Sequence, residues 1–185
     1  STLFPYTTLF RSASKTFEVP ATNALTDTTN TNTAYIRFPN SYTAYGPPTK
    51  LCILLHGASK GISNDGSTGW THDTAYNNIV QALNDAGFAV MDSNGYNDSA
   101  STGHEHWGCP QALAGYIEAY DYYVNNYNLE KNVYIYGFSM GGLTALNLAV
   151  ARSFPIKCMM IGSPVISLYD QCISGTAQTI NYDLL

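Results

Sequence analysis

The feature that most restricts the fold of this chain is a short segment framed by glycines at residues 137–141, Gly-Phe-Ser-Met-Gly. It follows an apolar run of strand length at residues 133–136 and precedes a helix-like segment at residues 140–152. A chain that passes directly from a buried strand into a helix must bend sharply, and small residues are needed on both sides of the bend. The pattern therefore predicts a strand, a tight bend at Ser139 and a helix that begins near Met140. A tight turn with no chemical role is the alternative.

Strand-like and helix-like segments alternate along most of the chain. The continuous apolar runs, typical of strands buried on both faces, are residues 51–55, 88–91, 133–136 and 157–161. The segments with helical periodicity are residues 79–86, 111–127 and 140–152. Two earlier segments of alternating polarity, residues 15–19 and 33–38, are predicted to be antiparallel strands. This order predicts a single α/β domain, a three-layer α/β/α sandwich with a mostly parallel, doubly wound sheet.

Ser139, between the flanking glycines Gly137 and Gly141, is the candidate nucleophile. The N-terminus of a helix presents unpaired backbone amides and the positive end of the helix dipole, which together stabilise a developing oxyanion. We therefore expect the amide of Met140 to donate a hydrogen bond to such an oxyanion.

A second motif, His-Gly-Ala at residues 56–58, comes directly after the apolar run at residues 51–55. Gly57 permits a close approach of the backbone to a bound carbonyl group. We expect His56 to brace this loop, because a histidine in that position supports the backbone more often than it reacts.

Together these motifs resemble the α/β-hydrolase superfamily, with its esterase, lipase and prolyl-oligopeptidase-like branches. The residues that carry the resemblance are 51–58, 88–95 and 133–142. The resemblance extends over residues 33–168 and implies hydrolysis of an ester, amide or thioester of a small acyl substrate through an acyl-enzyme. It also implies that Ala58 supplies the second oxyanion amide and that no metal or organic cofactor takes part.

The resemblance further implies an acid and a histidine base that follow the serine in the chain. No histidine follows Ser139 in these 185 residues. We expect the acid and the base to be encoded beyond Leu185, so that this chain alone is inactive. Asp170 follows the strand after the bend, where some lipases place the acid, and a loop or capping role is its alternative.

His104 and His106 follow the run at residues 88–91 and are predicted to lie at the same sheet edge as Ser139. They are candidates for lining a substrate pocket and, less readily, for replacing the missing base. Ordinary loop polarity is the alternative. Two imidazoles without a third ligand do not make a metal site, so no metal is expected.

Charge and hydropathy exclude several partners. The net charge is −5 and only eight residues are Lys or Arg, which disfavours a nucleic-acid partner. No apolar run approaches the roughly 20 residues of a membrane-spanning helix. Cys52 and Cys158 lie in apolar runs and are predicted to be core residues. A bridge between Cys109 and Cys172 stays open, as does the cellular compartment.

Both ends of the chain carry unusual features. Residues 2–12 resemble the in-frame translation of a common sequencing adapter, so residues 1–14 are predicted to be artefactual or disordered and residues 15–185 to be a partial hydrolase domain. The chain stops soon after the run at residues 157–161. We expect that strand to have an unpaired apolar edge through which the chain self-associates.

Two function classes follow from these observations. The first is a serine hydrolase of the carboxylesterase or serine-peptidase type, with Ser139 as nucleophile. The second is a non-catalytic, hydrolase-like binding module in which the catalytic triad was never complete. The reading frame beyond Leu185 distinguishes them, since a histidine after a further strand favours the enzyme.

Overall fold

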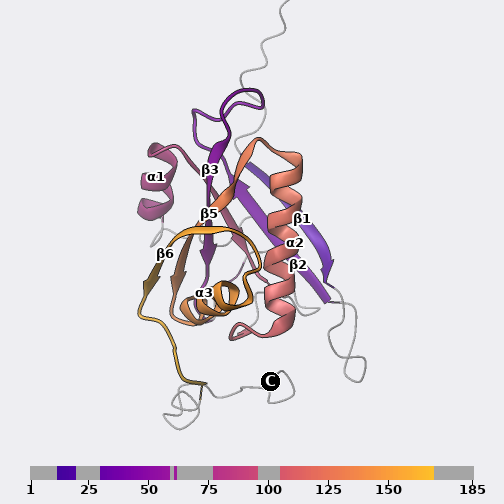
Figure 1. Ribbon diagram of the computed structural model, residues 1–185, viewed down its shortest axis with the longest axis vertical. Helices are drawn as coiled ribbons and strands as arrows, with labels where there is room; N and C mark the ends of the chain where they lie inside the picture. Colours follow the sequence, from indigo (N-terminus) through magenta and orange to yellow (C-terminus); the bar gives the residue numbers. More distant parts are fainter. Residues whose placement is uncertain (1–11, 20–29, 59–60, 62–76, 96–104, 169–185) are drawn as a thin grey trace, which may run out of the picture.

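A single mixed sheet organises the molecule (Figure 1). The computed structural model describes residues 12–19, 30–58, 61, 77–95 and 105–168. In these residues the strands are β1 (Ser12–Val19), β2 (Asn30–Arg37), β3 (Thr49–Leu55), β4 (Phe88–Ser93), β5 (Leu129–Phe138) and β6 (Ile156–Gly162). The helices are α1 (Asn77–Asp85), α2 (Pro110–Asn126) and α3 (Met140–Ala151).

The strand order in the described sheet is β1-β2-β4-β3-β5-β6. Strands β3 to β6 pair in parallel, whereas β2 pairs antiparallel with both β1 and β4. The chain leaves β3 toward β4 on one side and leaves β5 toward β6 on the other. The order of connections therefore reverses between β3 and β5, which is where open α/β sheets bind their ligands. The predicted mostly parallel, doubly wound sheet is confirmed.

Helices cover both faces of the sheet, which gives the three predicted layers. Helices α2 and α3 lie in front of the sheet in Figure 1 and α1 packs on the opposite face. Alternate residues of β3 explain why. Leu51, Ile53 and Leu55 belong to the cluster under α2 and α3, while Cys52 and Leu54 pack with α1. Because β3 is buried on both faces, its sequence is a continuous apolar run instead of an alternating one.

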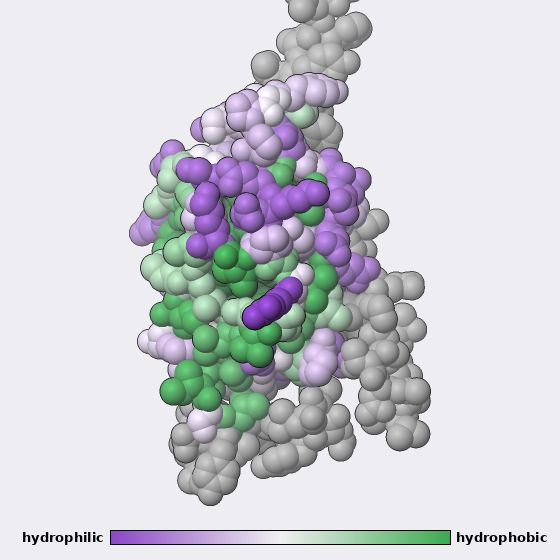
Figure 2. Space-filling view, in the orientation of Figure 1, coloured by the Kyte–Doolittle hydropathy of each residue, from purple (hydrophilic) through white to green (hydrophobic). Residues whose placement is uncertain are grey.

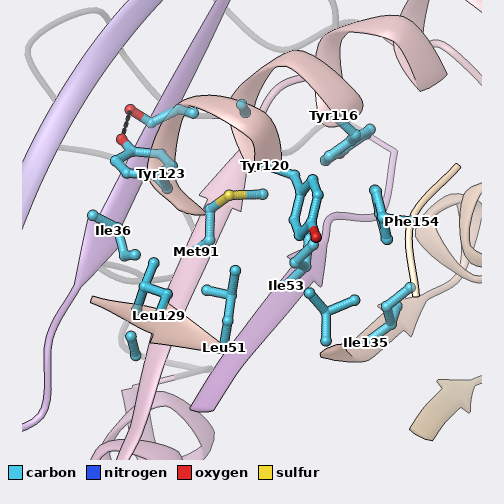
Figure 3. Close-up of a cluster of buried hydrophobic side chains, with 14 of the residues drawn as sticks. Ile36, Leu51, Ile53, Met91, Tyr116, Tyr120, Tyr123, Leu129, Ile135 and Phe154 are labelled. Carbon is cyan, nitrogen blue, oxygen red and sulfur yellow. Dashed lines mark hydrogen bonds between the residues drawn. The ribbon is translucent and has the colours of Figure 1, made fainter. Parts of the chain in front are cut away.

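Tyrosines of α2 form much of the larger core (Figure 3). Tyr116 and Tyr123 are fully buried, and Tyr120 packs against Phe154 with ring centroids 4.7 Å apart. The buried hydroxyl groups are hydrogen-bonded to backbone carbonyl groups, since Tyr116 donates to Ser93 O at 2.9 Å and Tyr123 donates to Ala34 O at 3.1 Å. These bonds connect α2 to the end of β4 and to the middle of β2.

The prediction that Cys158 is a core residue is wrong. Cys52 is buried as expected, and burial raises the pKa of its thiol to about 12. Cys158 is exposed because it lies at the far side of the sheet face that carries α1, and α1 packs on β4. Across that face Cys52 is followed by Tyr134 of β5 and then by Cys158. In the described residues no helix reaches this end of the face.

The other strand boundaries differ from prediction mainly at β5. This strand begins at Leu129, before the predicted start at residue 133, and its first residue pairs with Thr49. Residues 130–132 are polar, so they hid the first part of the strand in the sequence. A register shift between Thr49 and Leu51 accommodates the extra residues.

Some predictions fall outside the described residues. These are the state of residues 1–11 and the pairing of Cys172 with Cys109. Residues 12–14, which were predicted to belong to an artefactual segment, form the start of β1. None of the helices in the described part of the chain has the length and apolar character needed to cross a membrane.

Replacement of Tyr123 by Phe tests the bond between α2 and β2. Phenylalanine keeps the ring in the core but removes the donor to Ala34 O, so we expect the free energy of unfolding to fall by about 1 kcal/mol. Urea denaturation followed by circular dichroism measures this change. Tyr45→Phe is the control, because Tyr45 is 93% exposed and its replacement is expected to have no effect. Equal midpoints for the two variants would contradict the assignment.

Candidate active site

Ser139 lies at the junction between β5 and α3, as predicted from the sequence. Phe138 is the last residue of β5 and Met140 is the first of α3, so a single residue makes the bend. The backbone of Ser139 has φ 54° and ψ −118°, a conformation that residues other than glycine adopt rarely. Strain of this kind persists only where the surrounding structure enforces it, and it concentrates at functional sites.

Three glycines allow the elements around the bend to approach each other. A Cβ atom at Gly141 would overlap the backbone carbonyl of Leu55 at the end of β3. A Cβ atom at Gly137 would lie 2.5 Å from the carbonyl oxygen of Gly141, and one at Gly142 would lie 2.7 Å from Pro164 Cβ. Each of these contacts is shorter than a real Cβ atom tolerates. The close packing expected around the bend therefore depends on the absence of side chains at these three positions.

The chain after β6 holds the backbone of Ser139 from the other side. The amide of Ser139 donates to Gly162 O at 3.0 Å, and Ser139 O accepts from the amides of Gly142 at 2.9 Å and Val165 at 3.1 Å. Both polar groups of the Ser139 backbone are therefore engaged. These bonds fix the backbone of Ser139 at the carboxyl edge of the sheet. Its side chain is only half buried, so the hydroxyl group is partly accessible.

The loop at residues 56–58 lies against the bend. A Cβ atom at Gly57 would be 3.5 Å from Ser139 Cβ and 3.6 Å from Phe138 O. Ala58 is half buried and packs against a small apolar cluster that contains Met140. The structure thus brings together the two segments that were predicted to supply the oxyanion amides.

His56 lies beneath this loop and is fully buried. Its Nδ1 is 2.9 Å from Gly57 O and its Nε2 is 3.3 Å from Asn94 O. A neutral imidazole has one N–H group, which can donate to one of these two oxygens. Burial lowers the pKa of His56, while the two carbonyl oxygens partly offset that effect. The lowered pKa favours the neutral ring near pH 7, and with its proton on Nε2 this ring donates to Asn94 O and connects the loop after β3 to the loop after β4.

His106 is also buried, which loop polarity alone does not explain. Its Nδ1 accepts a hydrogen bond from the amide of Gly108 at 3.1 Å, which places the proton of the neutral ring on Nε2. The ring packs edge-on against His56 at 5.2 Å and against Tyr116 at 5.9 Å. His106 thus belongs to the interior under the loops.

The remaining candidates, His104 and Asp170, lie outside the described residues. Within the described ranges, no three His, Cys, Asp or Glu side chains gather as metal ligands would.

A layer of buried polar groups supports the end of β4. Ser93 Oγ donates to Asn32 Oδ1 at 2.9 Å and accepts from the amide of Gly95 at 3.1 Å. Asn32 Nδ2 donates to Gly115 O on α2 at 2.8 Å. The pKa of the neighbouring Tyr116 is raised well above its usual value by burial and by the charge of Asp92. Sequence reasoning missed this layer, although the polar residues directly after the apolar run of β4 were its signal.

Trp107 is the second feature that sequence reasoning missed. It is only 9% exposed and forms the apolar cluster with Met140 and Val165, against which Ala58 and Leu168 pack. The tryptophan therefore lies beside the bend and the loop at residues 56–58. Its position in a loop expected at the site edge was the available signal.

Comparison with known proteins identifies a family and a fold. A family model described as serine aminopeptidase, S33, matches residues 46–181. None of the curated proteins matches the chain.

Solved structures share the α/β-hydrolase fold. Est1E from Butyrivibrio proteoclasticus with ferulic acid bound has a TM-score of 0.56 and 22% identity over 82% of this chain and 55% of its own. The fluorophosphonate-binding serine hydrolase F of Staphylococcus aureus has a TM-score of 0.57 and 19% identity over 94% of this chain and 63% of its own. A serine hydrolase without lid from Xanthomonas campestris has a TM-score of 0.55 and 19% identity over 87% of this chain and 63% of its own. The chain thus spans between 55% and 63% of the length of these three proteins.

The burial of His56 predicts a loss of stability in acid. Its pKa in the folded state is below the ordinary value of 6.5, so as the pH falls below that value the unfolded chain takes up the proton first. The free energy of unfolding should therefore decrease below about pH 6.5, by at most about 1.4 kcal/mol per pH unit for one proton. Urea denaturation at pH 7.5 and 5.5 measures the decrease.

In the His56→Gln variant the free energy of unfolding should depend less steeply on pH, because the unfolded chain no longer takes up a proton at this position. An NMR titration offers a second measurement that does not depend on the variant's folding. The titration midpoint of the His56 ring resonances should lie below 6.5, and a midpoint at the ordinary value would contradict the assignment.

Proposed function

Because the chain belongs to the serine aminopeptidase family of α/β hydrolases, we propose that it is part of a serine hydrolase that uses Ser139 as its nucleophile. The substrate is a small molecule with an ester or amide bond, cleaved through an acyl-enzyme as in carboxylesterases and serine peptidases. The observation that carries this proposal is the strained backbone of Ser139 at the start of α3, held against the loop at residues 56–58.

In the proposed reaction the Ser139 oxygen attacks the carbonyl carbon of the substrate and gives its proton to a histidine base. The carbonyl oxygen becomes an oxyanion, which the amides of Met140 and Ala58 stabilise. Collapse of this intermediate expels the leaving group with the proton from the histidine and leaves an ester on Ser139. Water then attacks the ester, returns the serine and releases the acid. Each oxyanion donor typically contributes about 10²- to 10³-fold in rate.

The base of this reaction is proposed to lie beyond Leu185, together with the acid unless Asp170 fills that role. Two observations support this proposal. No histidine follows Ser139, and His56 and His106 are buried with ring nitrogens near or bonded to backbone groups. We therefore expect these 185 residues alone not to turn over esters.

Ser139→Ala tests the nucleophile. In the full-length gene product this replacement should abolish hydrolysis of p-nitrophenyl butyrate and labelling by a fluorophosphonate probe, because no oxygen remains to attack. Ser153→Ala is the control, since Ser153 follows the other end of α3, and it should keep both activities. Retained labelling of the Ser139→Ala protein would end the proposal. A wild-type protein that is folded but neither labelled nor active would favour the binding module.

We also propose that the chain self-associates through β6. This strand is the edge of the described sheet, and the apolar side chain of Met160 is 60% exposed. Figure 2 shows hydrophobic residues gathered over the side of the molecule on which β6 lies. An exposed strand edge with apolar residues is a template for pairing with another chain.

Met160→Lys should therefore weaken self-association of the 185-residue chain. A charge at the edge strand costs free energy when two such edges pair. Light scattering at tens of micromolar, under reducing conditions, should show dimers for the wild type and monomers for the variant. Val150→Lys on α3 is the control, because Val150 is 84% exposed and is not part of β6. A monodisperse wild-type monomer would refute this proposal.

A further inference from the structure

We propose that Trp107 recognises the acyl group of the substrate, with its indole N–H donating a hydrogen bond to an acceptor atom in that group. The inference rests on the proposed function, because it places the acyl group at Ser139. The substrate class is a short acyl ester or amide whose acyl chain carries an ether, hydroxyl or keto oxygen.

Backbone strain first marks this residue. In the described residues four amino acids other than glycine have positive φ, namely Trp107 (48°), Ser139 (54°), Arg152 (51°) and Ser163 (43°). Arg152 is the C-terminal cap of α3, where the left-handed conformation is ordinary. Ser163 directly follows Gly162, which binds the Ser139 amide. For a residue as bulky as tryptophan this conformation costs about 1–3 kcal/mol and calls for a cause.

The surrounding structure holds Trp107 in this conformation. On one side His106 Nδ1 accepts from the amide of Gly108, and His106 O accepts from the amide of Cys109 at 2.9 Å. On the other side Asn147 Nδ2 donates to Gly108 O at 3.1 Å, which fastens the turn to α3. A Cβ atom at Gly108 would lie 2.8 Å from Asn147 Nδ2, so the turn sits directly on the helix. The turn that carries the indole is therefore fixed to α3.

The position of the indole relates it to the proposed chemistry. It packs against Met140 and Val165, and Ala58 contacts the same cluster. Met140 follows Ser139 in the chain, and the amide of Val165 donates to Ser139 O. An acyl group whose carbonyl oxygen reached the amides of Met140 and Ala58 would lie next to this cluster.

The indole nitrogen supplies the argument for a polar ligand. In the part of the chain that the structure describes, Trp107 Nε1 is buried and has no hydrogen-bond partner. A buried Trp N–H usually has a partner, and leaving it without one costs about 1–3 kcal/mol. An acceptor atom on the ligand would remove that cost, whereas a purely alkyl chain would not. The site should therefore prefer an acyl chain with an oxygen over its hydrocarbon isostere.

Binding of two matched esters tests this preference without turnover. Ethyl methoxyacetate and ethyl butyrate have the same chain length and differ by an ether oxygen in place of a methylene group. We would titrate both, by ligand-observed NMR, into the full chain carrying Ser139→Ala and Trp70→Phe, in which Trp107 is the only tryptophan. The methoxy ester should bind at least fivefold more tightly and change the Trp107 fluorescence. Equal Kd values would overturn the proposal. A water molecule that already accepts from the indole N–H would give this same result, and it would overturn the proposal as well.

An isostere of tryptophan provides the control for shape. Benzothienylalanine at position 107 keeps both rings and replaces the N–H by sulfur. The preference for the methoxy ester should vanish while the Kd of ethyl butyrate stays the same. A preference that survives this replacement would overturn the proposal, because the N–H would not be its source.

The outcomes separate this proposal from the proposed function. Failure of the nucleophile assignment appears as fluorophosphonate labelling that persists after Ser139→Ala. Failure of the Trp107 assignment appears only in the ratio of the two Kd values, which needs no catalysis.

Discussion

The backbone at Ser139 is the constraint on which the site depends. One residue turns β5 into α3, and the turn is feasible only because α3 can press against the end of β3 without a side chain at Gly141. That close contact carries the loop at residues 56–58 up to the serine. The hydrogen bonds from Gly162 and Val165 then fix the bend from the β6 side. Backbone packing thus determines the geometry of the site, and it also determines where the Ser139 side chain lies.

The topology explains why these segments share one edge. The chain leaves β3 toward α1 on one face and leaves β5 toward α3 on the other, and both strands end at the same carboxyl edge of the sheet. The same arrangement explains the burial of β3 on both faces. At β6 the pattern changes, since only the face toward α3 is covered in the described residues, and Cys158 and Met160 are exposed.

The sequence predicted features that depend on local pattern and missed those that depend on distant packing. The bend at Ser139 and the buried strand β3 were predicted because glycine spacing and apolar runs are local. The burial of β3 was independent of the exact helix positions. The exposure of Cys158 was missed because it depends on which part of the sheet α1 covers. The early start of β5 was missed because Leu129 is placed by its pairing with Thr49, eighty residues earlier in the chain.

The buried polar groups around the site differ in how they are satisfied. Ser93, Asn32 and the Tyr116 hydroxyl form bonds that connect β2, β4 and α2, and His56 bridges the two loops above them. Such a paired layer makes the loops rigid, because any movement would break bonds that water cannot replace in the interior. Rigid loops can hold residues in strained conformations, as they do at Trp107. An indole N–H without a partner beside this paired layer is costly in the free protein, and the cost falls when a ligand supplies the acceptor. The same rigidity that fixes Ser139, the proposed nucleophile, would therefore make the neighbouring site selective.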